Sequence, residues 1–333
     1  MSPLAVVTGA SGFVGGGVAR ELLDAGYDVR ATARSRAAAS AIRDRVRDPR
    51  PSLQIVEGDV LERGSLEDAF AGSNLVVHAA GVVAACPRDP SGMLRTNVIG
   101  TTNAVTAAAR ARVARFVLTS SAATIGERAG QVGREDTPHR GWFLSSYERS
   151  KAEGEAAAFA LGRDLGLDVL SVNPASVQGP GRADGTARLL LAAARGRLPV
   201  ATTTTISFVD VDDCARGHVL AAERGSPGRR YLLCGATMSA MEALALVDRV
   251  TGRSRRRLAV SGRVVSAAAA VVETAFRALL RDPPFCREVA AAIEDGRAYD
   301  GSLATRALGL GYTPAEETVR RTIAWFRSAG LLR

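Results

Sequence analysis

Two residues placed one helical turn apart carry the clearest chemical signal in the sequence. Tyr147 and Lys151 are four positions apart in the stretch SSYERSKAEG, so on a helix their side chains share one face. A tyrosine has a pKa near 10 and exchanges protons poorly at neutral pH unless a nearby cation stabilises its anion. Lys151 is the only lysine among 43 Lys and Arg residues. A compact ammonium suits this task better than a planar guanidinium, so the pair predicts a tyrosine that exchanges a proton with substrate.

Two further polar positions join this candidate catalytic set. Ser121 follows the apolar run at 115–119, and we expect its hydroxyl to hydrogen-bond the substrate oxygen, with Ser120 as the weaker choice. Asn97 is expected either to anchor the neighbouring backbone or a proton-relay water, or only to stabilise its own helix.

A glycine-rich turn, TGASGFVG, follows the first apolar run of the chain. Gly9 permits a tight turn, Gly12 lets a pyrophosphate approach the backbone, and Gly15 allows close packing of helix on strand. At the first strand–helix junction of an alternating chain, this spacing predicts a dinucleotide cofactor. The expected contacts here are Gly9, Ser11, Gly12, Phe13, Val14 and Gly15.

The end of the second strand indicates which cofactor is bound. An acidic residue there would bond the ribose 2′-hydroxyl of NAD, but this position is Ala33, and Arg34 follows it. A guanidinium pairs with a 2′-phosphate, so NADP(H) is favoured, with Arg36 as a helper, and NAD(H) stays the alternative. Arg34 could instead be a solvent-facing arginine. Further cofactor contacts are expected at the ends of the next two strands, from Asp59, Val60, Ala79, Ala80 and Gly81.

The elements that must position these residues alternate between strands and helices. Apolar runs at 4–8, 28–33, 53–57, 75–78, 115–119 and 167–172 are separated by helix-length segments, one of them a polar helix ending near Pro49. This rhythm predicts a doubly wound, Rossmann-type α/β sheet. We assign residues 1–173 to the dinucleotide-binding domain, with its last strands from about 200–235. Residues 174–199 and 236–333 form a smaller, mostly helical substrate region, whose apolar helix at 264–280 is either a lid or a packing helix.

Composition excludes several classes of function. Net charge is +9, but apart from Arg253–Arg257 the basic residues are dispersed, and only 5% of residues are aromatic, so no nucleic-acid partner is expected. The four cysteines and three histidines are scattered, so no metal site is expected. No basic leader, signal peptide or membrane span is apparent, and a reducing, cytoplasmic location is expected.

These motifs together resemble the extended short-chain dehydrogenase/reductase family over almost the whole chain. The resemblance rests on the glycine turn, HAAG at 78–81, Asn97, Ser121, Tyr147 and Lys151, NPASVQGP at 173–180, and FVDVDD at 208–213. Dihydroflavonol reductase or 3β-hydroxysteroid dehydrogenase-like members and hopanoid-associated sugar epimerase-like members look nearest. The resemblance implies a Ser–Tyr–Lys triad, a homodimer, and nicotinamide contacts from Pro174 and Val177. It also implies that Asp210, Asp212 and Asp213 organise the core by helix capping.

The sequence therefore predicts an NADPH-dependent enzyme that reduces a carbonyl, or oxidises the alcohol, of a small apolar or aromatic metabolite. Expected substrate contacts are Val82, Ser121, Phe143, Ser176 and Arg182, the last for an anionic group. Two alternatives stay open: a nucleotide-sugar epimerase with tightly bound NAD, and a non-catalytic NADP-binding sensor. A dehydratase is disfavoured because Ala122 and Ala123 follow Ser121 where an acidic pair is usual.

Overall fold

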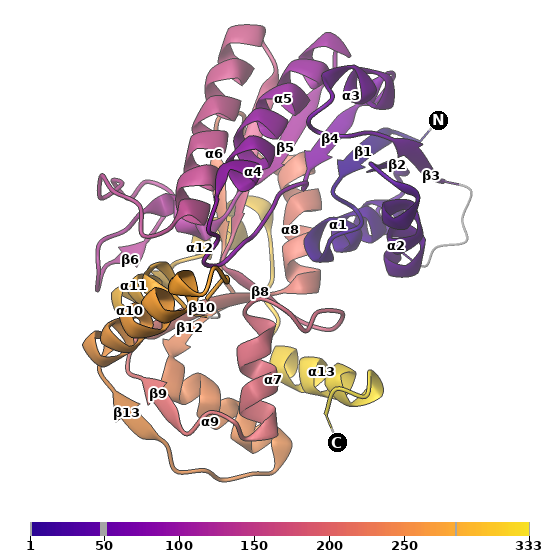
Figure 1. Ribbon diagram of the computed structural model, residues 1–333. Coiled ribbons are helices and arrows are strands. Elements are labelled where there is room, and N and C mark those ends of the chain that lie inside the picture. Colours follow the sequence, from indigo (N-terminus) through magenta and orange to yellow (C-terminus); the bar gives the residue numbers. More distant parts are fainter. Residues whose placement is uncertain (1, 47–51, 284, 333) are drawn as a thin grey trace.

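A seven-stranded parallel sheet forms the centre of the molecule (Figure 1). The computed structural model describes residues 2–46, 52–283 and 285–332. In spatial order the strands are β11 (Arg230–Leu233), β7 (Asp168–Pro174), β5 (Arg115–Thr119), β4 (Leu75–His78), β1 (Leu4–Thr8), β2 (Asp28–Ala33) and β3 (Leu53–Glu57). The chain order reverses between β1 and β4, and this switch point is where doubly wound sheets bind ligands. The predicted fold class is confirmed.

Both faces of the sheet are covered by helices, because alternate strand residues point to opposite faces. In β1, Ala5 and Val7 pack into one core and Val6 into the other. The first core holds α1 (Phe13–Asp24), α2 (Arg36–Val46) and α8 (Val211–Arg224). The second holds α3 (Arg63–Phe70), α5 (Gly100–Arg110) and α6 (Ser146–Leu165). The expected end of the second helix near Pro49 lies outside the described residues.

Helix α6, which carries Tyr147 and Lys151, has defined signals at both ends. The Ser145 side chain accepts a hydrogen bond from the Glu148 N–H, and Gly166 ends the helix in the left-handed conformation. Helix α8 begins in the same way, because the Asp210 carboxylate accepts from the Asp212 N–H at 2.9 Å. The capping role predicted for Asp210 is therefore confirmed.

A second lobe lies at the carboxyl edge of the sheet. Helices α7 (Ala187–Arg195), α9 (Ala240–Thr251) and α13 (Ala315–Ser328) share a separate core. Three small sheets join it: β12 (Ala236–Ser239), β10 (Thr205–Asp210) and β8 (Ser176–Gln178); β13 (Leu258–Val260) and β9 (Val200–Thr202); β14 (Ala298–Tyr299) and β6 (Val132–Gly133). Of the two strands expected within 200–235, β11 joins the main sheet and β10 joins a small one. The short α12 (Ser302–Leu308) packs against α8 and β11.

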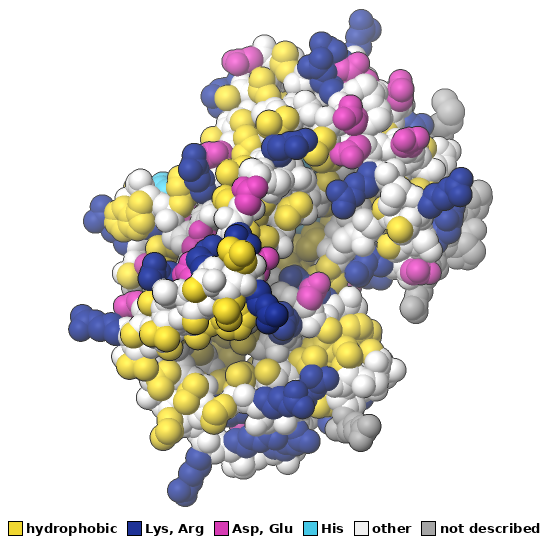
Figure 2. All heavy atoms as spheres, in the orientation of Figure 1, with side chains coloured by type: hydrophobic (Ala, Val, Ile, Leu, Met, Phe, Trp, Pro, Cys, Tyr) yellow, Lys and Arg dark blue, Asp and Glu magenta, His cyan; other side chains and the backbone are white. Residues whose placement is uncertain are grey.

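Helices α10 (Gly262–Ala278) and α11 (Arg287–Asp295) pack against each other on the outside of this lobe. The outward face of α10 is apolar, with Val264 58% and Val271 71% exposed. Figure 2 shows hydrophobic and basic side chains side by side over this part of the surface. Among the described residues, none of the helices combines the length and apolar character needed to span a membrane.

Candidate active site

Tyr147 and Ser121 meet at the carboxyl edge of the sheet. Tyr147 lies in the first turn of α6, and Ser121 follows β5 and caps a short 3-10 helix, η2 (Ala122–Ile125). Burial raises the pKa of Tyr147, while the hydrogen bond of Ser121 and the charge of Arg182 lower it. Burial is the largest of these effects, so the tyrosine is protonated at neutral pH. The two sequence-predicted hydroxyls are thus close enough to affect each other, and the protonated Tyr147 can act as a proton donor.

Lys151 lies one turn further along α6. Its Nζ donates a 2.7 Å hydrogen bond to the main-chain oxygen of Thr119. Burial lowers the pKa of Lys151 to about 8, and the nearby Glu155 carboxylate raises it. The structure differs here from the sequence expectation, because the cation that lowers the pKa of Tyr147 is Arg182. The Lys151 ammonium is directed to the Thr119 carbonyl instead.

Asn97 holds the loop that follows β4. It lies in a single π-helical turn, η1 (Arg95–Ile99), which follows α4 (Ser91–Leu94). Its Oδ1 accepts from the Val82 N–H at 2.8 Å, and its Nδ2 donates to the Val82 oxygen at 2.9 Å and to Ser150. A side chain at Gly81 would come within 3.2 Å of Asn97 Oδ1 and 3.8 Å of Lys151 Nζ. Asn97 is therefore a backbone anchor, one of the roles predicted for it.

The glycine turn has the form that a dinucleotide requires. Gly9 has φ +72°, and a Cβ there would lie 2.6 Å from the Ala80 nitrogen; a Cβ at Gly15 would lie 2.3 Å from the Gly9 oxygen. Helix α1 starts at Phe13 with Gly12 at its N-cap and no side-chain cap. Its first N–H groups therefore have no intrahelical partner, and they could hold a phosphate group. The residues present fit a dinucleotide cofactor.

The expected adenosine end is open and basic. Arg34 and Arg36 are exposed, and the side chain of neither forms a hydrogen bond or ion pair within the described part of the chain. Asp59 uses one carboxylate oxygen to cap its own turn, accepting from the Leu61 N–H at 2.9 Å. Val60 is buried beside Gly100, where a Cβ would lie 2.8 Å from its side chain. Arg34 is thus free to meet a 2′-phosphate.

Arg182 lies close to both the glycine turn and Tyr147. Its guanidinium lies 5.7 Å from the centre of the Phe13 ring, and its Nε is 2.6 Å from an Asp184 oxygen. The same charge acts on Tyr147. Arg182 therefore lies near both the first residue of α1 and Tyr147.

The remaining residues predicted to contact substrate or cofactor interact mainly with their own neighbours in the structure. Ser176 donates to Thr186 at 2.9 Å, and the Phe143 ring lies 5.1 Å from that of His139. Val177 is buried in the core. Pro174 ends β7 and is buried. Val82 is 36% exposed beside the Asn97 anchor and can line a substrate site.

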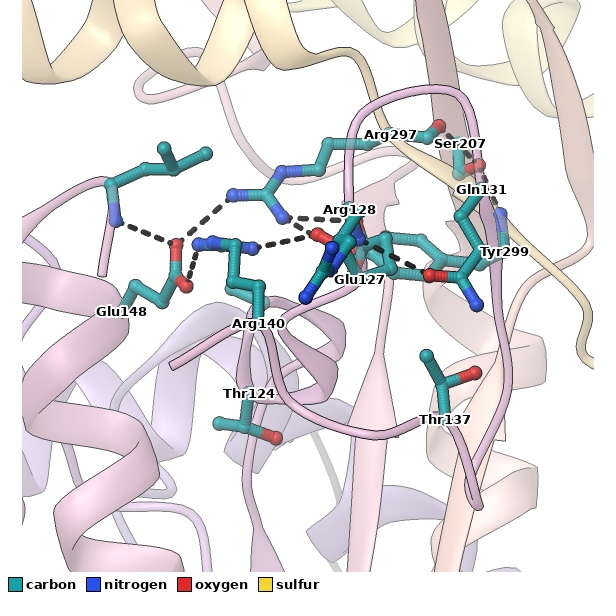
Figure 3. A network of polar contacts seen from close by, with 12 residues as sticks. Thr124, Glu127, Arg128, Gln131, Thr137, Arg140, Glu148, Ser207, Arg297 and Tyr299 are labelled. Carbon is teal, nitrogen blue, oxygen red and sulfur yellow. Dashed lines mark hydrogen bonds and ion pairs between the residues drawn. The ribbon is translucent and has the colours of Figure 1, made fainter. Parts of the chain in front are cut away.

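A buried network of charges lies at the start of α6, and no sequence pattern indicates it. Arg297 donates to Glu127 at 2.9 Å and to Glu148 at 3.0 Å, and Arg140 donates to Glu148. Figure 3 shows the two guanidinium groups between the two carboxylates. Burial raises the pKa of Glu148, and the charges of Arg297 and Arg140 lower it. The four residues lie at sequence positions whose proximity no spacing rule predicts.

Cys86 and Cys286 form a disulfide across 200 positions of sequence. Cys214 and Cys234 are buried and free. Disulfides are rare in reducing compartments, so this bond and the expected cytoplasmic location point in different directions. The bond joins the loop after β4 to the start of α11.

A cavity of about 600 Å³ lies beside the first turns of α1. Its lining includes Phe13, Arg20, Arg45, Arg321 and Trp325. Within the described ranges, no three His, Cys, Asp or Glu side chains gather in a way that could hold a metal ion.

The fold and site define a dinucleotide-dependent enzyme of the extended short-chain dehydrogenase/reductase type. The chain belongs to the NAD dependent epimerase/dehydratase family, whose sequence profile matches residues 5–234. It is 31% identical to sterol demethylase protein B of Methylococcus capsulatus, over 98% of this chain and 99% of that protein. It is 32% identical to cinnamoyl-CoA reductase 1 of Oryza sativa subsp. japonica, over 73% and 75%. The solved structure of gox2253 is 30% identical, covers both chains fully and superposes with a TM-score of 0.86.

Proposed function

We propose that the protein is an NADPH-dependent reductase of an apolar or aromatic carbonyl compound, and the dehydrogenase of the corresponding alcohol. The observation that carries this proposal is the pairing of Tyr147 with Ser121 at the carboxyl edge of the sheet. A protonated tyrosine next to a second hydroxyl can share one substrate oxygen with it. Relatives named as reductases support the reaction type.

Each residue of the site has a separate task in this proposal. The bound nicotinamide would supply a hydride for reduction or accept one for oxidation. Ser121 polarises the substrate oxygen, and Tyr147 gives its proton to that oxygen. The charge of Arg182 stabilises the tyrosinate that remains. Lys151, held by Thr119 and near Gly81, would contact the ribose of the bound cofactor.

The cofactor preference and the substrate class are part of the same proposal. Unpaired Arg34 favours a 2′-phosphate and therefore NADPH. The exposed apolar side chains of Val82 and Val83 next to the Asn97 anchor favour an apolar substrate wall. A homodimer of the kind usual in this family completes the proposal, and light scattering after size-exclusion chromatography checks it.

The direct test is NADPH oxidation with a panel of aromatic and aliphatic ketones and aldehydes, using the wild type and Tyr147→Phe. We expect the variant to lose turnover by ~10²–10⁴-fold, since that is the usual contribution of a general acid. NADPH affinity, measured by fluorescence titration, is expected to stay unchanged. Turnover retained in Tyr147→Phe would refute the proposal.

A second candidate is a nucleotide-sugar epimerase, which the family match favours. Such an enzyme would be isolated with NAD bound and would interconvert UDP-sugars without consuming NADPH. Binding of NADPH with neither activity would indicate the non-catalytic sensor.

A further inference from the structure

Residues of the second lobe contact the first turn of α6 on both sides of Tyr147. Before the tyrosine, the Ser146 N–H and hydroxyl both donate to Glu288 Oε1, at 3.1 and 2.6 Å. After it, Glu148 Oε2 accepts from Arg297 at 3.0 Å. Both outer residues belong to the segment that contains α11 and β14. The two neighbours of the proton donor are therefore fixed by one stretch of chain far away in sequence.

The contact at Ser146 suits the start of a helix. The N–H groups of the first turn have no intrahelical partner, and the helix dipole favours negative charge there. Glu288 supplies that charge from another helix, α11, so the contact orients the two helices as well as satisfying a donor.

The contact at Glu148 is buried, so its geometry is closely constrained. The side chains of Glu127, Arg140 and Glu148 are at most 2% exposed, and that of Arg297 is 18% exposed. A guanidinium that bridges two carboxylates has a fixed planar geometry, and removal of one partner leaves a buried charge uncompensated. Figure 3 shows the guanidinium groups of Arg297 and Arg140 side by side between the carboxylates of Glu148 and Glu127. Glu148 thus has little freedom to move, and neither has the residue before it.

The same segment is also joined to the loop after β4. Cys286, at the start of α11, is bonded to Cys86 in the loop that Asn97 anchors at Val82. Arg88 in that loop donates to the Leu280 oxygen at 3.0 Å. The segment therefore contacts both the proton donor's helix and the loop after β4.

We propose that Glu288 and Arg297 are positioning residues for Tyr147, which set the tyrosine hydroxyl against Ser121 and the substrate oxygen. This inference rests on the reductase function proposed above. Proton transfer requires the hydroxyl within about 2.6–3.2 Å of the oxygen that it protonates. A misplacement of about 1 Å can lower the rate about 100-fold. Through Glu288 and Arg297, the second lobe, which is expected to bind substrate, controls the proton-transfer step without touching the reacting atoms.

The test compares Glu288→Ala, Glu288→Gln and Arg297→Gln with a matched control, Arg134→Gln. Arg134 pairs with Asp300 at 2.9 Å near β14 but is 61% exposed, and none of its hydrogen bonds or ion pairs within the described residues involves α6. We expect kcat for carbonyl reduction to fall at least tenfold in Glu288→Ala and Arg297→Gln, with KM and NADPH affinity within about threefold. The isotope effect with 4-deuterated NADPH is expected to rise as the chemical step becomes limiting. Glu288→Gln keeps the acceptor oxygen and is expected to restore most of kcat.

Hydrogen exchange gives a readout that does not need activity. Backbone amides of residues 146–150 are expected to exchange faster in Glu288→Ala and Arg297→Gln than in the wild type, and unchanged in Arg134→Gln. If the wild type reduces no carbonyl compound, the proposed function fails while this readout still tests the positioning. Wild-type exchange and wild-type kcat in Glu288→Ala would overturn the inference. So would an equal loss of kcat in Arg134→Gln. If Arg297→Gln does not fold, Glu288→Ala still tests the inference.

Discussion

The ammonium of Lys151 is hydrogen-bonded to the main-chain oxygen of Thr119 at 2.7 Å, which ties α6 to the carboxyl end of β5. Ser121, two residues after Thr119, lowers the pKa of Tyr147 in the same helix α6. The strand end and the helix are therefore joined at the cation and close to each other at the proton donor. The only lysine of the chain is held in place by a backbone oxygen, a contact that does not depend on the identity of a neighbouring side chain.

This arrangement predicts how activity depends on pH. The pKa of Lys151 is lowered to about 8, so its ammonium is present below that pH and is lost above it. We expect kcat/KM for carbonyl reduction to be flat at neutral pH and to fall about tenfold per unit above pH ~8. The measurement is initial rate between pH 6 and 10 at fixed NADPH. In Lys151→Met the residual activity is expected to lack this limb, and an unchanged profile in that variant would contradict the assignment.

Unfolding of the protein does not explain a fall in kcat/KM above pH ~8. The pKa of Lys151 is below its ordinary 10.5 in the folded protein, so between about 8 and 10.5 the unfolded chain binds more protons. The contribution of Lys151 to the free energy of unfolding therefore increases with pH in this window. Thermal unfolding measured at pH 7 and 9 separates the two effects.

Most of the sheet and of the cofactor site could be predicted because their signals are local. Apolar runs give the strands, and the turn around Gly9 has a spacing set by backbone sterics at one junction. The pairing of Tyr147 and Lys151 on one face follows from helical period alone. The hydrogen-bond partner of each side chain cannot be predicted from the helical period, because Lys151 bonds to Thr119 in strand β5.

The contacts of the C-terminal lobe could not be predicted, because they join distant parts of the chain. Glu288 meets Ser146, and Arg297 meets Glu148, across more than a hundred residues. Cys86 and Cys286 carry no local spacing motif. Their proximity depends on how the second lobe packs on the sheet, and no periodicity in one sequence encodes that packing.

The exposed side chain of Arg34 leads to a prediction that the protein prefers NADPH to NADH. It is exposed and has no hydrogen bond or ion pair in the described ranges, so its guanidinium is free for a 2′-phosphate. A charge-assisted hydrogen bond is worth about 1.5–3 kcal/mol, or roughly 10- to 100-fold in affinity. We expect Arg34→Ala to weaken NADPH binding by that factor and to leave NADH binding almost unchanged. Arg36→Ala is the matched control, with a smaller effect. Fluorescence titration measures both, and equal losses for NADPH and NADH would contradict the role.

The disulfide predicts a dependence of stability on redox conditions. Cys86 and Cys286 close a loop of 200 residues, and such a cross-link stabilises the folded state by restricting the unfolded chain, typically by about 2–4 kcal/mol. We expect Cys286→Ser to lower the Tm by several degrees under oxidising conditions. Dithiothreitol is expected to lower the wild-type Tm to the same value and to leave the variant unchanged, because Cys214 and Cys234 are free thiols already.

Thiol counting supplies the control for that experiment. The denatured, unreduced wild type is expected to show two reactive thiols, those of Cys214 and Cys234, and four after reduction. Four thiols before reduction would show that the bond does not form in the isolated protein. Because the bond also ties α11 to the loop anchored by Asn97, its loss is expected to speed hydrogen exchange in residues 82–90. A lower Tm without faster exchange there would limit the bond to a role in global stability.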